Sequence, residues 1–288
     1  MKEHIFSFPD AWKFRIGMTI DDAVKEFSRS NKDVLDGIRD VAIDAIQGVE
    51  GILSSIPWFL LILIVMILGY IVSKKIRVGL LYGAMMFFIG AADLWEHMID
   101  TLSVVMVAVM ISLILGFPIG ILIAMSKRAG NAIRPVLDMM QTMPTFVYLV
   151  PAVMLFNTGA MPALLATVIY SIVPMIRMTS HGIIYVDKEV QEAAIAFGST
   201  KMQALIKVQI PQALPTIMTG VNQTIMMAMS MVVTCAIIGA EGLGLEILVA
   251  TNRVELGKAL LPGIAIVIVA IIFDRLTQGL IRKKEVVE

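Results

Sequence analysis

The residues best suited to a specific interaction lie in one polar segment, 187–211, of an otherwise apolar chain. The segment holds an acidic residue, small residues, one aromatic residue and turn formers, namely Glu192, Ala193, Ala194, Phe197, Gly198 and Pro211. The spacing of three and four between Val190 and Phe197 predicts a short helix with a narrow apolar face. Asp187 is placed to cap this helix, and Gly198 can take the left-handed conformation that ends it. This pattern favours recognition of a partner surface, with Phe197 filling a pocket on that surface.

A second short helix is predicted to follow. Thr200 and Gln203 have the spacing of a capping box, which marks the start of a helix. We expect Pro211 and Pro215 to stop this helix before the next membrane span. The segment is therefore predicted to be a compact pair of helices outside the membrane.

The rest of the chain is predicted to be helical and embedded in a membrane. Of its 288 residues, 58% are hydrophobic and only 16% are charged, whereas soluble proteins have about 25% charged residues. Several apolar runs approach the ~20 residues that cross a bilayer as a helix. We expect an all-α, polytopic membrane protein with about seven spans, at residues 57–73, 78–95, 102–125, 135–157, 161–179, 216–238 and 260–276. Gln141, Pro144 and Pro151 interrupt the fourth span and predict a kinked or broken helix.

The basic residues predict the orientation of the spans. Lysine and arginine gather in the linkers that follow spans one, three and five and at the C-terminus, at Lys74, Lys75, Arg77, Lys127, Arg128, Lys188, Lys201, Lys207, Arg282, Lys283 and Lys284. Basic linkers remain in the cytoplasm. We therefore expect a bacterial plasma-membrane protein with its N-terminus outside and its C-terminus in the cytoplasm.

Four regions follow from this pattern. Residues 1–55 form a tail that is amphipathic from Val34 onward and is expected outside, on the membrane surface or packed on the bundle. Residues 56–100 form two peripheral spans, and residues 101–280 form the core with segment 187–211. Residues 281–288 form a cytoplasmic tail.

Segment 187–211 resembles a known motif. Glu-Ala-Ala at residues 192–194, Gly198, and Val-Gln-Ile-Pro at residues 208–211 resemble the EAA loop of ABC importer permeases. The family pattern is Glu-Ala-Ala, Gly, then Ile-x-Leu-Pro, so Val208 and Ile210 are conservative departures. The resemblance implies the type I permease fold, with coupling helices that sit in a groove of the ATPase. An ordinary amphipathic linker would not need this spacing.

Other stretches are similar to those of glycine betaine/proline betaine permeases. They lie at residues 137–151, 220–225, 230–233 and 273–278, and the similarity covers roughly residues 102–280. Glu241 departs from the family pattern, which usually has a small residue there. The resemblance implies ATP-driven uptake of an osmoprotectant during osmotic stress.

The energy source is expected on another chain. No Gly-x-x-x-x-Gly-Lys-Ser/Thr phosphate loop occurs here, so no cofactor is expected in this chain, and ATP and Mg²⁺ would bind the partner ATPase. The resemblance implies two permease copies, an ABC ATPase and an extracytoplasmic substrate-binding protein. Neither catalytic residues, nor metal ligands, nor a nucleic-acid partner are expected.

Polar and aromatic residues within the spans are candidates for the translocation pathway. They are Gln141, Thr145, Phe146, Tyr148, Asn222 and Thr224, and hydrogen bonding between helices explains the polar ones equally well. Quaternary ammonium groups favour aromatic cages, and few aromatic residues lie mid-membrane, so we expect a weak site here. Glu241 and Glu246 lie in an outer segment that could dock the binding protein or could be a solvated loop.

Two other functions are compatible with parts of this pattern. An ABC permease for choline, carnitine or an amino acid would share the EAA-type loop, and only the betaine-type stretches argue against it. A channel or secondary carrier that does not depend on ATP would have no use for residues 192–211.

Overall fold

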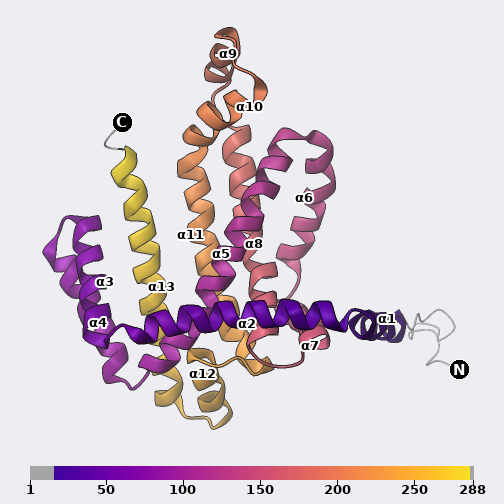
Figure 1. Ribbon diagram of the computed structural model, residues 1–288. Coiled ribbons are helices and arrows are strands. Elements are labelled where there is room, and N and C mark those ends of the chain that lie inside the picture. Colours follow the sequence, from indigo (N-terminus) through magenta and orange to yellow (C-terminus); the bar gives the residue numbers. More distant parts are fainter. Residues whose placement is uncertain (1–15, 286–288) are drawn as a thin grey trace, which may run out of the picture.

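The computed structural model describes residues 16–285, and this part of the chain is built from helices without any strand (Figure 1). The all-α prediction is confirmed. Residues 1–15 and 286–288, the outer parts of the two predicted tails, lie outside the described residues.

Seven helices occupy the positions of the seven predicted spans. They are α3 (Trp58–Ser73), α4 (Ile76–Ala91), α5 (Trp95–Met125), α6 (Lys127–Thr142), α8 (Ala160–Ile184), α11 (Ile210–Thr234) and α13 (Leu256–Glu285). Four stretches are long and apolar enough to cross a membrane alone, and two bent helix pairs raise the number to six. The expected count of seven is one higher because of α4, whose 16 residues extend only about 24 Å.

One predicted boundary is wrong. Trp95 was expected to end the second span, but α4 stops at Ala91 and Trp95 begins α5. The chain reverses between them at Asp93, whose φ of 62° lies in the left-handed region. Aspartate tolerates this conformation better than most residues, and the pattern of apolar residues does not reveal it.

The predicted break in the fourth span is confirmed. Helix α6 and the next helix, α7 (Phe146–Phe156), are bent by 100° relative to each other. Met143 is extended at the bend, as expected for a residue that precedes a proline, here Pro144. The bend leaves α6 upright beside the bundle and lays α7 across one end of it (Figure 1).

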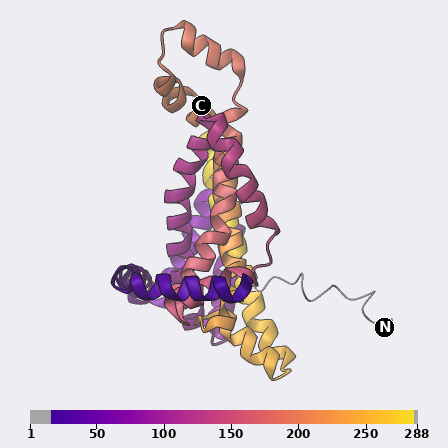
Figure 2. The ribbon, with the colours of Figure 1, turned by 90° about the vertical axis from the view of Figure 1, so that its right-hand side faces the viewer.

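The predicted amphipathic helix is α2 (Lys32–Ser55), which follows α1 (Ile16–Ser30). It bends by 93° into α3 and lies across the bundle rather than along it (Figures 1 and 2). Ile46 is buried against the bundle, whereas Asp44, on the other side of the helix, is exposed. The alternation of apolar and acidic residues thus places one face of α2 on α5 and leaves the other free.

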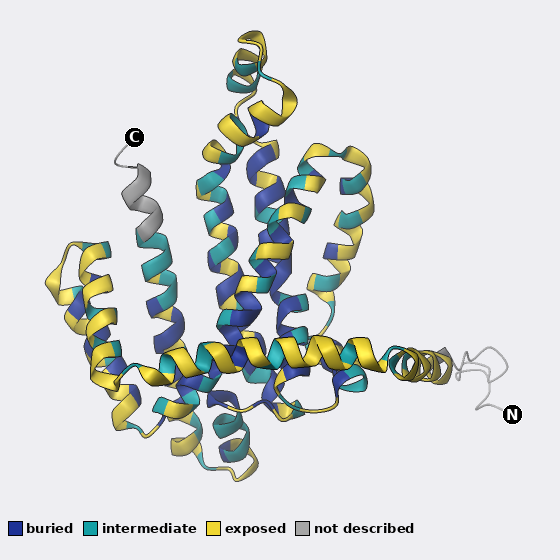
Figure 3. Cartoon of the chain, in the orientation of Figure 1, coloured by how far each residue is buried: buried dark blue, intermediate teal, exposed yellow. Residues whose placement is uncertain are grey.

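The core of the bundle is formed by α5, α8 and α11, where buried residues gather (Figure 3). Glycines let these helices approach closely. A methyl group added at Gly120 of α5 would lie 2.6 Å from Cβ of Thr179 on α8, and one added at Gly220 of α11 would lie 2.7 Å from Cβ of Met178. Small residues at such contacts maximise van der Waals packing between membrane helices.

The bundle has two distinct ends. Helices α9 (Lys188–Ala196) and α10 (Lys201–Ala204) lie beyond one end, and the C-terminus of α13 points toward the same side. Helix α2 and the short α12 (Leu243–Asn252) lie at the opposite end. Both views show α9 and α10 projecting from the bundle, away from the other helices (Figures 1 and 2).

Candidate functional site

The two projecting helices belong to segment 187–211, which we call the projecting segment. Both predicted caps of its first helix, α9, are confirmed. The side chain of Asp187 accepts a hydrogen bond of 2.8 Å from the backbone N–H of Glu189. Gly198 has a φ of 82°, and its N–H donates to the carbonyl of Ile195. No residue of α9 is buried by the rest of the chain. The helix is therefore capped at both ends, and most of its surface is open to a partner.

Phe197 follows the last residue of α9 and is 92% exposed. A large aromatic side chain in that position loses the free energy that burial would provide, roughly 2 kcal/mol. Burial in a pocket of another protein would recover that free energy. The geometry agrees with the use of Phe197 as an anchor, and Glu192 and Ala193 beside it are also exposed.

The second helix starts at the predicted capping box. The N–H of Gln203 donates to Oγ1 of Thr200 at 3.3 Å, and the N–H of Thr200 donates to Oε1 of Gln203 at 2.9 Å. The amide of Gln209 donates to Oε1 of Gln191 on α9 at 3.0 Å. This bond ties α9 to the chain that enters α11.

The expected helix stop at Pro211 and Pro215 is wrong. Instead, α10 continues through a π-helical turn, η2 (Leu205–Gln209), into α11, and both prolines lie inside the continuous helix. A proline ring collides with the carbonyl four residues earlier. The wider π turn, in which the N–H of Ile210 donates to Leu205, relieves this collision for Pro211. The continuous helix connects the projecting segment directly to the middle of the bundle.

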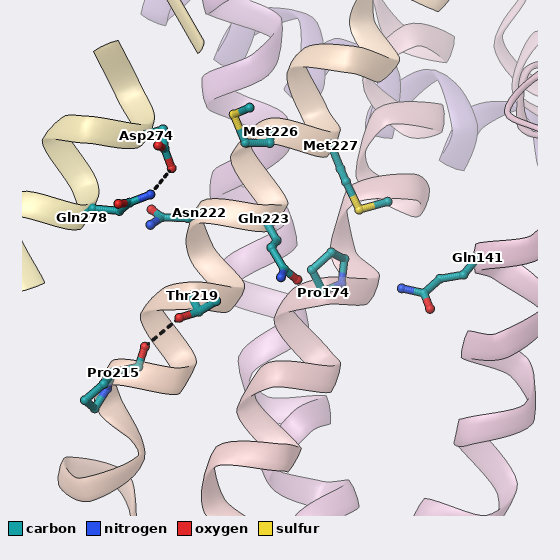
Figure 4. Close-up of a pocket in the computed structure, with 10 residues that line it drawn as sticks. All are labelled: Gln141, Pro174, Pro215, Thr219, Asn222, Gln223, Met226, Met227, Asp274 and Gln278. Carbon is teal, nitrogen blue, oxygen red and sulfur yellow. Dashed lines mark hydrogen bonds between the residues drawn. The ribbon is translucent and has the colours of Figure 1, made fainter. Parts of the chain in front are cut away.

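A cavity of about 580 Å³ lies along α11, and we call it the central cavity. It is lined by polar residues, prolines and methionines from α6, α8, α11 and α13, namely Gln141, Pro174, Pro215, Thr219, Asn222, Gln223, Met226, Met227, Asp274 and Gln278. Figure 4 shows Gln141 on α6 standing apart from the others, with its amide directed toward Pro174. The cavity therefore lies between α6 and the other three helices.

Two of the predicted pathway residues, Gln141 and Asn222, line the central cavity. Asn222 is buried, and its side-chain oxygen has no hydrogen-bond partner. A buried amide oxygen without a partner is costly, so a donor in the cavity would stabilise it. Sequence reasoning placed Asp274 and Gln278 in a betaine-type stretch but not in the pathway. Their side chains are hydrogen-bonded to each other at 2.6 Å (Figure 4). Their spacing of four at the end of an apolar span was the available signal.

The other four predicted pathway residues do not line this cavity. Tyr148 is buried and donates its hydroxyl hydrogen bond to the carbonyl of Met140, which ties α7 to α6. Thr224 is fully buried on the opposite side of α11. Thr145 and Phe146 lie at the start of α7, where Phe146 is exposed. A polar residue in a span does not by itself indicate which side of the helix it occupies.

A cavity of about 700 Å³, which we call the charged cavity, adjoins the central one toward the α9 end. The two share Pro215 and Thr219 of α11. An ion pair of 2.5 Å between Arg177 of α8 and Asp138 of α6 borders the charged cavity. The polar hollow therefore extends from the middle of the bundle toward the projecting helices.

The opposite end of the bundle holds the two acidic residues predicted to dock a partner. Glu241 is exposed, whereas Glu246 on α12 lies 3.6 Å from His97 on α5. Between them, the N–H of Leu243 donates to Oγ1 of Thr101 at 2.9 Å. The turn before α12 is thus attached to α5, and only Glu241 is free on its surface.

Comparison with known proteins shows close relatives at the level of sequence and a shared fold at the level of structure. The chain is 44% identical over 253 residues to the glycine betaine/carnitine transport permease protein GbuB of Listeria monocytogenes, covering 87% of this chain and 89% of that one. It is 42% identical to the glycine betaine/proline betaine permease ProW of Escherichia coli, covering 86% and 70%. A solved inward-facing structure of the MetNI methionine ABC transporter shares the fold, with a TM-score of 0.54 at 18% identity, covering 62% and 89%.

A family model supports the same assignment. Residues 116–286, which include the projecting segment and both cavities, match the binding-protein-dependent transport system inner membrane component. This region leaves out α1 to α4, which precede it. The chain therefore belongs to this family: it is a multi-pass membrane subunit of an ABC importer, whose ATPase is a separate subunit, and it is not an enzyme.

Proposed function

We propose that this chain forms the translocation pathway of an ATP-driven importer of glycine betaine or a closely related betaine. Segment 187–211 is the surface that docks the separate ATPase, which binds ATP and Mg²⁺. The observation that carries this proposal is the exposure of Phe197 on a capped helix that projects from the bundle. Such an anchor would serve no purpose in a channel or carrier that does not bind an ATPase.

Coupling follows from the continuity of the helices. The projecting segment joins α8 at one side and runs without a break into α11 at the other. Both helices line the central and charged cavities. When the ATPases close on ATP and move α9, they would displace the walls of these cavities. ATP binding and pathway opening thus become linked equilibria, each of which shifts the other.

The proposed solute rests on the relatives and on the chemistry of the central cavity. Relatives that match most of this chain are named as glycine betaine permeases. Among the described residues, those that line the central cavity offer amide groups and the carboxylate of Asp274 but no aromatic side chain. A quaternary ammonium group would bind only weakly there, because it lacks the aromatic faces that attract it. Selectivity would then come from the substrate-binding protein.

The proposal also covers the assembly of the importer and the orientation of this chain in the membrane. A second copy of this chain would complete the membrane part of the importer. The α9 end would face the cytoplasm, because the basic turns at Lys74 and Lys127 lie at that end. The opposite end would receive the substrate-binding protein, with Glu241 on its surface.

Transport by the reconstituted complex tests this function. Vesicles that contain this chain, its ATPase and its binding protein should accumulate radiolabelled glycine betaine only when ATP is present. Unlabelled proline betaine should compete, and choline should compete less well. Accumulation by this chain alone, without ATP, would instead favour a secondary carrier. Preferential uptake of choline would reassign the solute while leaving the coupling mechanism in place.

The orientation has its own test. Gln203 lies on the exposed face of the projecting segment. In intact cells, a Gln203→Cys variant should not react with an impermeant thiol reagent, whereas inside-out vesicles should be labelled. The natural Cys235 is buried, so it provides an unreactive background. Labelling of intact cells would reverse the proposed orientation.

A further inference from the structure

A third cavity, of about 540 Å³, lies where α3, α4 and the start of α5 meet, at the α12 end of the bundle. Its wall combines three aromatic side chains with two carboxylates: Trp58, Phe87, Trp95, Asp93 and Glu96. It shares no lining residue with the central or the charged cavity. Ligand sites in proteins commonly have volumes of about 300–1,000 Å³, so this cavity can hold a small organic group.

The aromatic residues are held in place by a rigid hairpin of α3 and α4. A methyl group added at Gly79 would lie 2.6 Å from the carbonyl oxygen of Met66, and one added at Gly69 would lie 2.6 Å from the ring of Tyr82. The two helices are therefore in close contact along their length. This contact fixes Trp58, at the start of α3, relative to Phe87, near the end of α4.

The turn into α5 supplies the rest of the wall. Asp93 is one of the few non-glycine residues with a positive φ, and it lines the cavity. The turn brings the ring of Trp95 to 3.5 Å from the position that a side chain on Gly90 would occupy. A backbone conformation of this kind costs about 1 kcal/mol and is retained where the surrounding structure requires it. The strained residue here is itself one of the two carboxylates.

This combination differs from that of ordinary interfacial anchors. Tryptophans at the membrane surface commonly serve as anchors, which need no acidic partner. Here Trp58 is 56% exposed and Phe87 is 59% exposed, and both line the same cavity as Asp93 and Glu96. The faces of aromatic rings attract cations, and carboxylates strengthen that attraction. His97 also lines the cavity, but it lies 3.6 Å from Glu246, which compensates any positive charge on it.

We propose that this cavity is a binding site for an ammonium group, formed by Trp58, Phe87 and Trp95 with Asp93 and Glu96. The group could belong to a free quaternary ammonium solute or to the amine headgroup of a lipid, because both present the same cation. The site lies on the peripheral helices α3 and α4, outside the proposed pathway, and it does not depend on the proposed transport function.

The test is a binding titration of the full chain in nanodiscs of phosphatidylglycerol, whose headgroup has no amine. Two of the chain's three tryptophans line the cavity, so their fluorescence reports on binding. Tetramethylammonium and glycine betaine should produce a saturable change. The neutral alcohol 3,3-dimethylbutanol, which has a similar shape but no charge, should bind at least about fivefold more weakly.

A matched pair of variants locates the site. Phe87→Leu should weaken the binding of tetramethylammonium about fivefold, because one aromatic face is lost. Phe88→Leu is the control, because Phe88 is 38% exposed on the same hairpin but does not line the cavity. It should leave the affinity unchanged. The absence of a saturable response, equal binding of the neutral alcohol, or equal effects of the two variants would overturn the proposal.

A second set of nanodiscs distinguishes the two sources of the ammonium group. If the site holds a lipid headgroup, phosphatidylethanolamine in the nanodisc should compete and raise the apparent Kd of tetramethylammonium about tenfold. If the site serves a free solute, the Kd should be the same in both lipids. Either result identifies the occupant of the same site. ATP-driven uptake is not measured here, so failure of this proposal would leave the transport proposal intact.

Discussion

The two ends of the bundle carry connecting segments that differ in how far they are buried. Segment 187–211 projects into solvent, with Phe197 exposed and no residue of α9 buried. The turn before α12 is packed into the bundle, with Leu243 fully buried and its N–H bonded to Thr101 of α5. Both turns contain a glycine with positive φ, Gly198 and Gly242.

The comparison separates surfaces used for recognition from contacts used for stability. An added side chain at Gly198 would meet nothing within 4 Å, whereas at Gly242 it would lie 2.4 Å from Oγ1 of Thr101. Gly198 is required only because of its backbone conformation. Gly242 is required also because there is no room for a side chain. We therefore expect changes in the projecting segment to weaken ATPase binding, and changes in the buried turn to destabilise the fold.

The largest effect is expected for Gly242→Val. The new side chain would collide with Thr101 and the carbonyl of His97, and the φ of 102° would be strained. Overpacking and strain together should lower the free energy of unfolding by about 3 kcal/mol or more. The yield and the melting temperature of the purified chain in detergent measure this loss. Gly257→Val is the matched control, because a side chain there meets nothing within 4 Å and no positive φ is involved.

The second effect is expected for Phe197→Ala, and it concerns partner binding alone. An aromatic anchor contributes about 2 kcal/mol or more to an interface, so the affinity for the ATPase should fall roughly 30-fold. The melting temperature of the isolated chain should not change, because the side chain has no intramolecular packing to lose. Ile195→Ala, on the same helix and 59% exposed, should lower the affinity less than about threefold. Equal losses in the two variants would show that Phe197 is not the anchor.

Local sequence signals predicted the projecting segment well. The caps at Asp187, Gly198 and Thr200 depend on neighbouring residues only, and all three are present in the structure. The prediction that Pro211 ends the helix also failed for a local reason, because a π-helical turn accommodates the proline within the continuous helix. Hydrophobicity likewise predicted the positions of most helices, because most spans are continuous apolar runs. The fourth span, interrupted at Gln141 and Pro144, is the exception.

The lining of the cavities could not be predicted in the same way. Asn222 and Thr224 are two residues apart on α11, yet only Asn222 lines the central cavity. The side of a membrane helix that faces a cavity is set by the packing of other helices, and an apolar helix exposed to lipid carries little sign of it. Trp58 and Trp95 are 37 positions apart and belong to one cavity because of the reversal at Asp93. A non-glycine residue with positive φ leaves no clear mark in the sequence.

The smallest effect is expected when Gly198 and Gly242 are each replaced by asparagine and by valine. This experiment also gives the sharpest comparison of the two segments. Asparagine tolerates positive φ, whereas a β-branched residue does not, and the difference is about 1–2 kcal/mol. At position 198, where space is open, Gly198→Val should reduce ATPase affinity and uptake about tenfold, and Gly198→Asn should restore most of both.

At position 242 the same rescue should fail. Gly242→Asn has an acceptable φ, but its Cβ would still lie 2.4 Å from Oγ1 of Thr101. The melting temperature of this variant should fall nearly as far as that of the valine variant, because the collision does not depend on the type of side chain. Rescue by asparagine at both positions would mean that backbone conformation alone requires both glycines, and the distinction between an open turn and a packed turn would be lost. Rescue at position 198 only would establish that the two ends are built for different tasks.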